Sequence, residues 1–217
     1  MLFCYDRFDM KRTLKIIIAA SATILLILIF YFFFPHVWGE AVYPLEYKDS
    51  IAKYSKQQNL DPNLVCALIY TESRFNNTST SGAGARGLMQ IMPGTGASIA
   101  QDMGETNYNP DNLYDPDTNI RYGTFYIKGL IDKYPGDLDY ALAAYNAGVA
   151  RADAWKDGRN SLPFETVFYI QRVKDVQDMY NKVYGPWTFS SQVRKPNPFY
   201  QGITNFSSFV HRLILGR

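Results

Sequence analysis

The sequence predicts an all-α protein in which one helical domain follows a single N-terminal transmembrane helix. Apolar residues recur at helical spacing in successive segments of residues 47–185, and no stretch alternates polar and apolar residues as a half-buried strand would. Residues 16–34 are nineteen consecutive uncharged residues, which as a helix reach about 28 Å, close to the hydrocarbon thickness of a bilayer. The chain is long enough for one ordinary domain plus these appendages.

The apolar segment 16–34 predicts a retained membrane anchor. A cleaved secretory signal is the alternative, but its apolar region is shorter and ends in small residues, whereas this one ends in bulky aromatic residues. Four basic residues lie in residues 1–15, and no Lys or Arg follows the segment before Lys48. The positive-inside rule therefore predicts a single-pass protein of the cytoplasmic membrane, with residues 1–15 in the cytoplasm and the domain on the periplasmic or cell-wall side.

Charge and the rarer residue types exclude several classes of function. Residues 35–185 carry fourteen basic and eighteen acidic side chains, so this part lacks the basic surface that nucleic acid requires. The two histidines, His36 and His211, lie outside the predicted domain, so we expect no metal site there and no His-containing triad. Cys4 and Cys66 fall on opposite sides of the predicted membrane, and Cys66 is expected to be a buried apolar side chain.

A short juxtamembrane linker, residues 35–46, precedes the first helices of the domain, which spans 47–185. Residues 47–60 suit an amphipathic helix with Ile51 and Tyr54 on one side. A second helix begins at Asp61, an N-cap residue, followed by Pro62 at the first helical position. Its apolar residues follow helical spacing: Leu64, Val65, Leu68 and Ile69.

The remaining helices are delimited by Gly, Pro, Asn and Asp. A loop over 76–87 leads to a short helix from Pro93 towards Met103 and then to an irregular acidic stretch. Thr118 or Asn119 is expected to cap the next helix, which runs to residue 134. A further helix ends at Gly148.

The last long helix begins at residue 164 and is stopped by Gly185 and Pro186. Its expected core positions are Val167, Ile170, Val173, Val176 and Tyr180. The pattern thus predicts six or seven helices in the domain. The basic tail, residues 186–217, either lies on an anionic membrane surface or is docked or disordered, and its role stays open.

Glu72 is the only acidic residue between Leu68 and Gly96. It lies four residues after Leu68 on the apolar face of a helix and near the helix C-terminus, where partial burial and the helix dipole both raise the pKa of a carboxyl group. A raised pKa suits a general acid. Helical geometry alone fits equally a surface carboxylate that pairs with Arg74 or a distant Lys.

The glycines that follow Glu72 match a dinucleotide-binding fingerprint in letters only. Gly82, Gly84 and Gly87 have the spacing G-x-G-x-x-G, but that motif must follow a strand and open a helix within a βαβ unit. The preceding element here is a helix. We therefore expect no nucleotide-binding site in this loop.

Three separated blocks, "YTESRFNNTSTSGAGARGLMQIMPGTG", "ALAAYNAG" and "LPFETVFYIQRV", are similar to the successive signatures of the soluble lytic transglycosylase (SLT) domain family. The resemblance covers about residues 47–184 in the order of the family. It implies a lysozyme-like helical fold and cleavage of peptidoglycan glycan strands. Val167 and Phe168 depart from the pattern, which has more polar or smaller residues there.

The resemblance implies that Glu72 is the sole catalytic acid and base. The residues that it implies around the glycan lie in all three blocks: Ser73, Ser81, Met89, Gln90, Met92, Tyr145, Asn146, Glu165 and Tyr169. Met89 and Met92 could equally be packing residues, and the two tyrosines could be core aromatics. The expected reaction breaks the bond between N-acetylmuramic acid and N-acetylglucosamine and leaves a 1,6-anhydro end, without metal or cofactor.

Two other functions remain open from the sequence. A hydrolytic muramidase would use water and a second carboxylate from the loop aspartates, Asp111, Asp115 or Asp117, which we otherwise expect to serve turns. A non-catalytic glycan-binding component of an envelope or secretion complex would not need Glu72. The expected partners are therefore glycan strands and the membrane, with complex partners unknown.

Overall fold

The structure of the chain is a computed structural model that describes residues 10–185. The described residues form eight α-helices and one 3-10 helix, with two isolated β-bridges and no strand, so the predicted all-α class is confirmed. The predicted tail and the first nine residues lie outside the described part. The chain divides into two units, and the compact helical unit begins at Tyr43.

The first helix, α1, runs from Met10 to Val42. Its segment Arg12–Phe30 is long and apolar enough to cross a membrane, and none of that segment is buried within the protein. The helix continues past residue 34, so residues 35–42 of the predicted juxtamembrane linker, 35–46, are helical.

The helices α2 (Lys48–Gln58) and α3 (Pro62–Ser73) follow the sequence signals closely. Ile51 and Tyr54 of α2 are buried as expected. The side chain of Asp61 accepts a hydrogen bond from the backbone N–H of Asn63, which confirms the predicted N-cap. The residues of α3 from Val65 to Ile69 are all fully buried, so α3 is the central helix of the core.

The middle of the domain contains α4 (Pro93–Asp102), the 3-10 helix η1 (Pro110–Tyr114) and α5 (Pro116–Lys133). The prediction that Thr118 or Asn119 caps α5 is wrong. Asp115 is the cap, because its carboxylate accepts the N–H of Thr118 at 2.8 Å and a proline fills the first helical position.

The last three helices are α6 (Leu138–Ala147), α7 (Val149–Lys156) and α8 (Phe164–Tyr184). Gly148 ends α6 with a φ of +90°, as its position predicts, and α7 follows directly, which the sequence did not indicate. The prediction that Val167 faces the core is wrong, because Val167 is 51% exposed. The covered face of the first turns of α8 carries Thr166, Tyr169 and Ile170 instead.

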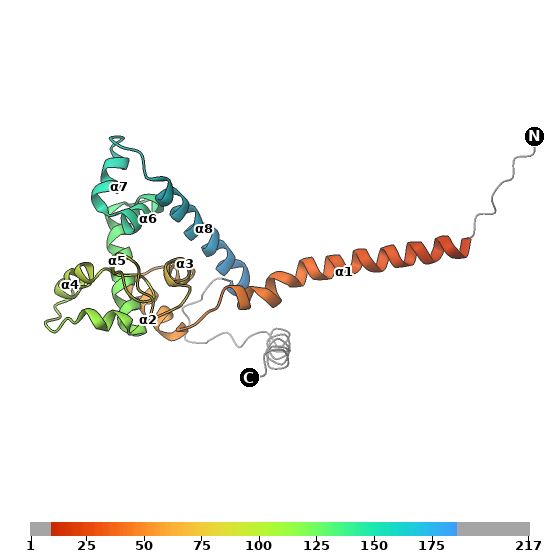
Figure 1. The fold of residues 1–217 in the computed structure, drawn as a ribbon, viewed down its shortest axis with the longest axis horizontal. Helices are drawn as coiled ribbons and strands as arrows, with labels where there is room; N and C mark the ends of the chain where they lie inside the picture. The colour runs from red at the N-terminus through yellow and green to blue at the C-terminus, as the bar shows by residue number, and fades with distance from the viewer. Residues whose placement is uncertain (1–9, 186–217) are drawn as a thin grey trace, which may run out of the picture. The chain divides into compact units, whose positions relative to one another are not determined.

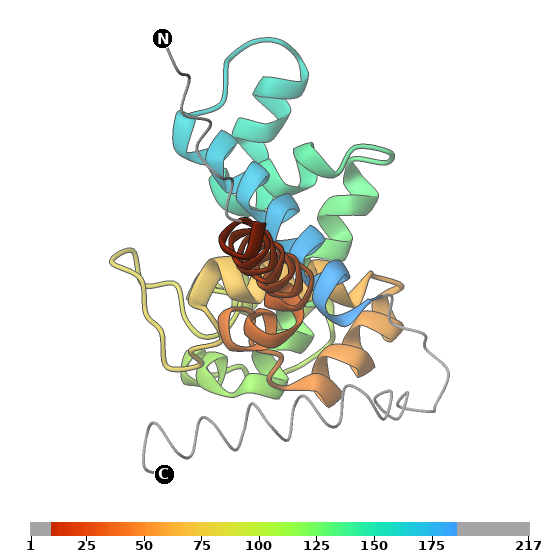
Figure 2. The ribbon, with the colours of Figure 1, turned by 90° about the vertical axis from the view of Figure 1, so that its right-hand side faces the viewer.

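Figures 1 and 2 show how these helices position one loop. Both α2 and α8 pack against α3; α5 packs against α2, α4, η1 and α6; and α6 also contacts α7 and α8. The segment between α3 and α4 is a long loop at the edge of this unit (yellow in Figure 2). The loop thus begins where the buried helix α3 ends.

Candidate active site

Glu72 lies in the last turn of α3, at the point where the buried helix reaches the surface. Its side chain is partly exposed, whereas Leu68, one turn earlier, is fully buried. The helix ends abruptly because Arg74 and Phe75 both adopt left-handed backbone conformations, with φ of +52° and +65°. A carboxyl group is therefore held at the C-terminal end of a rigid apolar helix.

The carboxylate of Glu72 accepts a hydrogen bond from the hydroxyl of Tyr169 on α8 at 2.6 Å. Burial raises the pKa of Glu72 to about 7, and this hydrogen bond opposes the rise by stabilising the charged form. Burial, and next the negative charge of Glu72, raise the pKa of Tyr169 well above its usual value, so Tyr169 remains a donor. Glu72 can consequently give up a proton and take one back near neutral pH.

The segment Leu88–Gln90 of the loop is fixed against three helices. The hydroxyl of Ser73 donates to the carbonyl oxygen of Leu88 at 2.8 Å, and the hydroxyl of Tyr145 on α6 donates to the carbonyl oxygen of Met89 at 2.7 Å. Burial raises the pKa of Tyr145, and the charge of Glu72 adds to the rise, so this tyrosine also lies near the carboxylate. The loop backbone is therefore held beside Glu72 by side chains of α3 and α6.

Asn119 of α5 provides the third attachment, and it is fully buried. Its side-chain oxygen accepts the N–H of Met89 at 2.7 Å, and its amide nitrogen donates to the carbonyl oxygens of Arg86 and Leu113 at 2.9 and 2.7 Å. One buried side chain thus makes three of the hydrogen bonds that hold the loop, although its position in the sequence predicts a helix cap.

Two glycines make room for this arrangement. A Cβ atom on Gly87, which has a φ of +75°, would lie 2.1 Å from the carbonyl oxygen of Leu113. A Cβ atom on Gly123 of α5 would lie 2.2 Å from the sulfur of Met89. The loop and α5 can approach this closely only because both positions lack a side chain.

The structure corrects one predicted substrate residue. Met89 is fully buried against α5, so its side chain belongs to the core and does not line a cleft. Its contribution to the site is its backbone, which binds Tyr145 and Asn119. Met92, three residues later, is 42% exposed and remains available to a ligand.

The other predicted residues differ in whether their side chains are bound within the protein. Gln90, at a φ of +48°, donates from its amide to the carbonyl oxygens of Gly87 and Ser79 at 2.8 and 3.2 Å, and Ser81 accepts the N–H of Ala85 at 3.0 Å. Both side chains thus shape the loop. Asn146 at the end of α6 and Glu165 in the first turn of α8 are exposed.

Tyr126 of α5 is a further aromatic residue of the site that the sequence did not single out. Its ring centroid lies 5.5 Å from that of Tyr145, and burial raises its pKa. Its position on α5, one turn after Tyr122, carried no signal, because the chain contains seventeen tyrosines.

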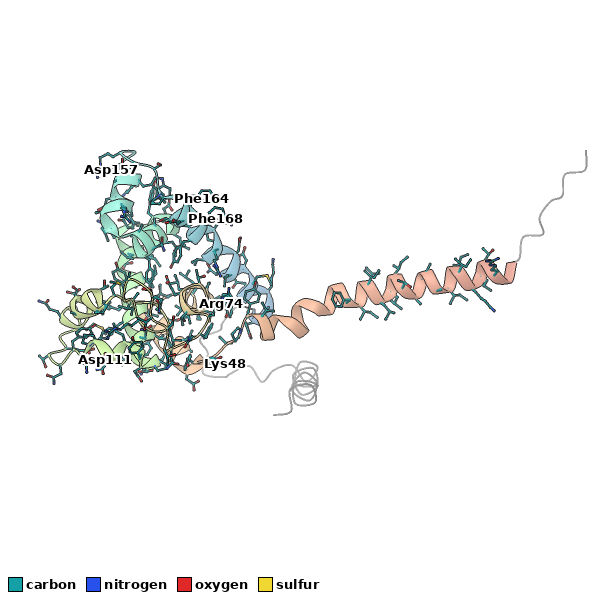
Figure 3. The ribbon with its side chains drawn as sticks, viewed as in Figure 1. Lys48, Arg74, Asp111, Asp157, Phe164 and Phe168 are labelled. Carbon is teal, nitrogen blue, oxygen red and sulfur yellow. The ribbon has the colours of Figure 1, made fainter. Side chains whose placement is uncertain are left out.

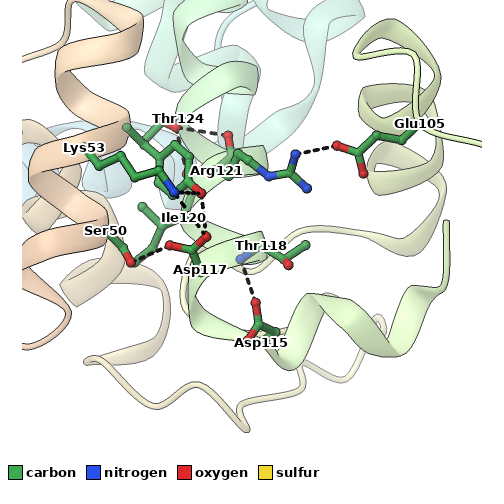
Figure 4. A network of polar contacts seen from close by, with 10 residues as sticks. Ser50, Lys53, Glu105, Asp115, Asp117, Thr118, Ile120, Arg121 and Thr124 are labelled. Atoms are coloured by element: carbon green, nitrogen blue, oxygen red, sulfur yellow. Dashed lines mark hydrogen bonds and ion pairs between the residues drawn. The ribbon is translucent and has the colours of Figure 1, made fainter. Parts of the chain in front are cut away.

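The loop aspartates serve the structure, as predicted for turns. Asp115 caps α5, and Asp117 accepts hydrogen bonds from Ser50 and Tyr54 of α2, which joins α2 to α5 (Figure 4). Asp111 forms an ion pair with Arg86 at 2.7 Å. Each of these carboxylates is already bound to a neighbouring group.

Comparison with known proteins identifies the same region. Residues 49–168 match the family model described as "Transglycosylase SLT domain". The chain is 41% identical over 119 residues to a transglycosylase of Enterobacteria phage PRD1, covering 55% of this chain and 41% of the phage protein. It is 32% identical over 142 residues to the membrane-bound lytic murein transglycosylase C of Actinobacillus succinogenes, covering 61% of this chain and 38% of that protein.

A solved structure supports the fold. The crystal structure of the 70-kDa soluble lytic transglycosylase from Escherichia coli superposes with a TM-score of 0.63 at 32% identity, covering 68% of this chain and 26% of that one. The lysozyme-like fold predicted from the family resemblance is therefore confirmed. The chain spans less than half the length of each of these three proteins.

Proposed function

The chain belongs to the transglycosylase SLT domain family, and from this we propose that it is a membrane-anchored lytic transglycosylase of peptidoglycan. The cleaved bond is the β-1,4 linkage from N-acetylmuramic acid to N-acetylglucosamine, and the product is a 1,6-anhydro-muramic acid end. The observation that carries the proposal is the carboxyl group of Glu72, whose pKa of about 7 allows it to act first as an acid and then as a base.

The proposed reaction begins with protonated Glu72, which donates its proton to the glycosidic oxygen as the bond from C1 of the muramic acid breaks. The N-acetyl oxygen of the same sugar stabilises the positive charge at C1. The Glu72 carboxylate then removes the proton of the C6 hydroxyl, and O6 bonds to C1. Glu72 ends protonated as it began, and no water is consumed.

The neighbouring residues support these two proton transfers. The hydrogen bond from Tyr169 stabilises the carboxylate that forms after the first transfer, at 2.6 Å. Ser73 and Tyr145 hold the loop backbone that borders the carboxylate. Ser81, Gln90, Met92, Asn146 and Glu165 are proposed to contact or position the glycan around this centre.

The membrane part of the proposal rests on the apolar segment Arg12–Phe30 and on the family relatives named as membrane-bound. We propose a single span with the N-terminus in the cytoplasm, because the basic residues flank the span on its N-terminal side. The catalytic unit then faces the peptidoglycan.

The hydrolytic alternative has less support from the geometry. Two-carboxylate glycosidases place their carboxyl groups about 5 to 9.5 Å apart on either side of the bond. Among residues 10–185, no second carboxylate contributes to the pKa of Glu72, and the three loop aspartates are bound to groups of their own. A single carboxylate that performs both transfers fits this arrangement better.

Digestion of purified peptidoglycan, followed by mass spectrometry of the products, tests the proposal. The wild type should release fragments with 1,6-anhydro ends, and Glu72→Gln should lower the rate by at least a hundredfold, since general acid–base catalysis contributes about that much. Asp132→Asn, which changes an exposed carboxylate of α5, should keep full activity. Products heavier by one water would support the muramidase, and unchanged lysis by Glu72→Gln would support a non-catalytic glycan-binding role.

A further inference from the structure

A pocket of about 330 Å³ lies between α7 and the segment that connects α7 to α8. Its lining consists of Ala150, Arg151, Ala154, Asn160, Ser161 and Pro163. None of these residues takes part in the site around Glu72. The volume is at the lower end of the range for small-ligand pockets.

The walls of the pocket are held by backbone hydrogen bonds. The N–H groups of Arg159 and Asn160 both donate to the carbonyl oxygen of Ala154, at 2.8 and 3.2 Å. The N–H of Thr166 donates to the carbonyl oxygen of Pro163 at 3.0 Å, where α8 begins. The connecting segment is therefore folded back onto α7 and keeps the pocket open.

The polar side chains of the pocket form no hydrogen bond or ion pair with other described residues, 10–185. The guanidinium of Arg151 forms no ion pair there, whereas Arg159 nearby is paired with Asp157 at 2.8 Å. The side chains of Asn160 and Ser161 are exposed, and no hydrogen bond within the described residues occupies them. The guanidinium of Arg151, the amide of Asn160 and the hydroxyl of Ser161 thus line one pocket together with apolar Ala and Pro side chains. This combination suits a carboxylate at the end of a short peptide.

The lining of the pocket is joined to two residues of the site through α8 and through the junction of α6 and α7. Pro163 precedes Tyr169 by six residues, which is about 9 Å along a helix, and Arg151 follows Tyr145 by six residues across the α6–α7 junction. Figure 3 labels Phe164 and Phe168 on the first turns of α8 and Asp157 on the connecting segment, all at this end of the domain.

We propose that this pocket binds a carboxylate of the short peptide carried by muramic acid, so that the enzyme distinguishes strands by the charge of their peptides. The proposal rests on the proposed function. The lactyl carboxyl group of a substituted muramic acid is consumed in its amide bond, so the negative charge of such a strand resides in the peptide. The guanidinium of Arg151 forms an ion pair with this carboxylate, and Asn160 and Ser161 form hydrogen bonds with neighbouring polar groups of the peptide.

The test uses the full chain in detergent micelles and two tetrasaccharides that carry the same peptide, one with free carboxylates and one with those carboxylates amidated. The wild type should cleave the free form with a kcat/KM about tenfold higher, chiefly through KM, as one charge-assisted hydrogen bond at an accessible site would give. Arg151→Gln should remove this preference, Arg151→Lys should keep part of it, and the matched control Arg159→Gln should keep all of it.

The outcomes separate the pocket from the catalytic proposal. Equal cleavage of both substrates by the wild type, or a preference that survives in Arg151→Gln, overturns the peptide pocket while transglycosylase activity stands. Loss of activity by Arg151→Gln on both substrates equally also overturns it, since the effect would then be general. If the wild type cleaves neither of these nor a peptide-free strand, the proposed function itself fails.

Discussion

Replacing Glu72 by Gln is expected to stabilise the domain in a strongly pH-dependent way. The pKa of Glu72 rises from 4.5 to about 7 on folding, chiefly through burial. Each pKa unit corresponds to about 1.4 kcal/mol, so ionised Glu72 destabilises the folded state by about 3 kcal/mol above pH 7. Gln resembles the protonated acid in shape and still offers an oxygen to Tyr169.

The sign of this pH dependence follows from the number of protons that Glu72 binds in the folded and unfolded states. Between pH 4.5 and 7 the folded protein binds more protons at Glu72 than the unfolded chain does, so the Glu72 contribution to the free energy of unfolding falls as pH rises. The difference between Glu72→Gln and wild type should therefore be near zero at pH 4 and reach about 2 to 3 kcal/mol at pH 8. The lower figure allows for water in a partly exposed site.

Urea unfolding of residues 43–217, which contain the whole described core, measures this difference at pH 4, 6 and 8. Glu165→Gln is the matched control, because this carboxylate is exposed in the first turn of α8, and its effect should stay within about 0.5 kcal/mol at every pH. A Glu72→Gln variant that is no more stable at pH 8 than at pH 4, relative to wild type, would refute the reasoning.

Three further predictions address the surroundings of the carboxylate. Tyr169→Phe removes the hydrogen bond that lowers the pKa of Glu72, so the alkaline limb of the activity profile, measured by peptidoglycan clearing, should move to higher pH. Asn119→Ala removes three hydrogen bonds of a fully buried side chain and should lower the free energy of unfolding by about 2 to 4 kcal/mol in urea titration. Gly123→Ala places a Cβ atom 2.2 Å from a buried sulfur and should lower stability by about 1 to 3 kcal/mol, whereas Gly129→Ala on the same helix meets nothing within 4 Å and should be neutral or slightly stabilising.

Each of these three predictions would be contradicted by a specific result. An alkaline limb that stays in place in Tyr169→Phe would show that the tyrosine does not set the pKa of the acid. Asn146→Ala, which changes an exposed amide, is the control for Asn119→Ala, and equal losses in the two would remove the special role of the buried amide. Equal effects of the two glycine changes would show that close approach of α5 to the loop is unimportant.

Local signals in the sequence predicted most helix boundaries, because the caps are made by neighbouring residues. Asp61 with Pro62 starts α3 and Gly148 ends α6, as expected. The same Asp-Pro signature is present at Asp115, the cap of α5, although Thr118 and Asn119 are also residue types that favour a cap. A cap can be recognised from two adjacent residues, but a buried asparagine and a capping asparagine look identical in sequence.

Long-range contacts account for the predictions that were wrong. Met89 belongs to the core because Gly123, thirty-four residues later, leaves space for its sulfur. Val167 has the spacing of a core residue in α8, yet its face of the first turns is uncovered, and 51% of the residue is exposed. Periodicity identifies a helix face, but which face is covered depends on where the neighbouring helices end.

The pKa of Glu72 results from opposing contributions that no single segment contains. Burial at the end of α3 raises the pKa, whereas the hydrogen bond that limits the rise comes from Tyr169, ninety-seven residues later. Without burial the carboxyl would be ionised at neutral pH and could not donate a proton. Without the tyrosine the pKa of Glu72 would be higher, and the residue would be a weaker proton donor in the first step, so packing of α8 against α3 serves the chemistry as well as the fold.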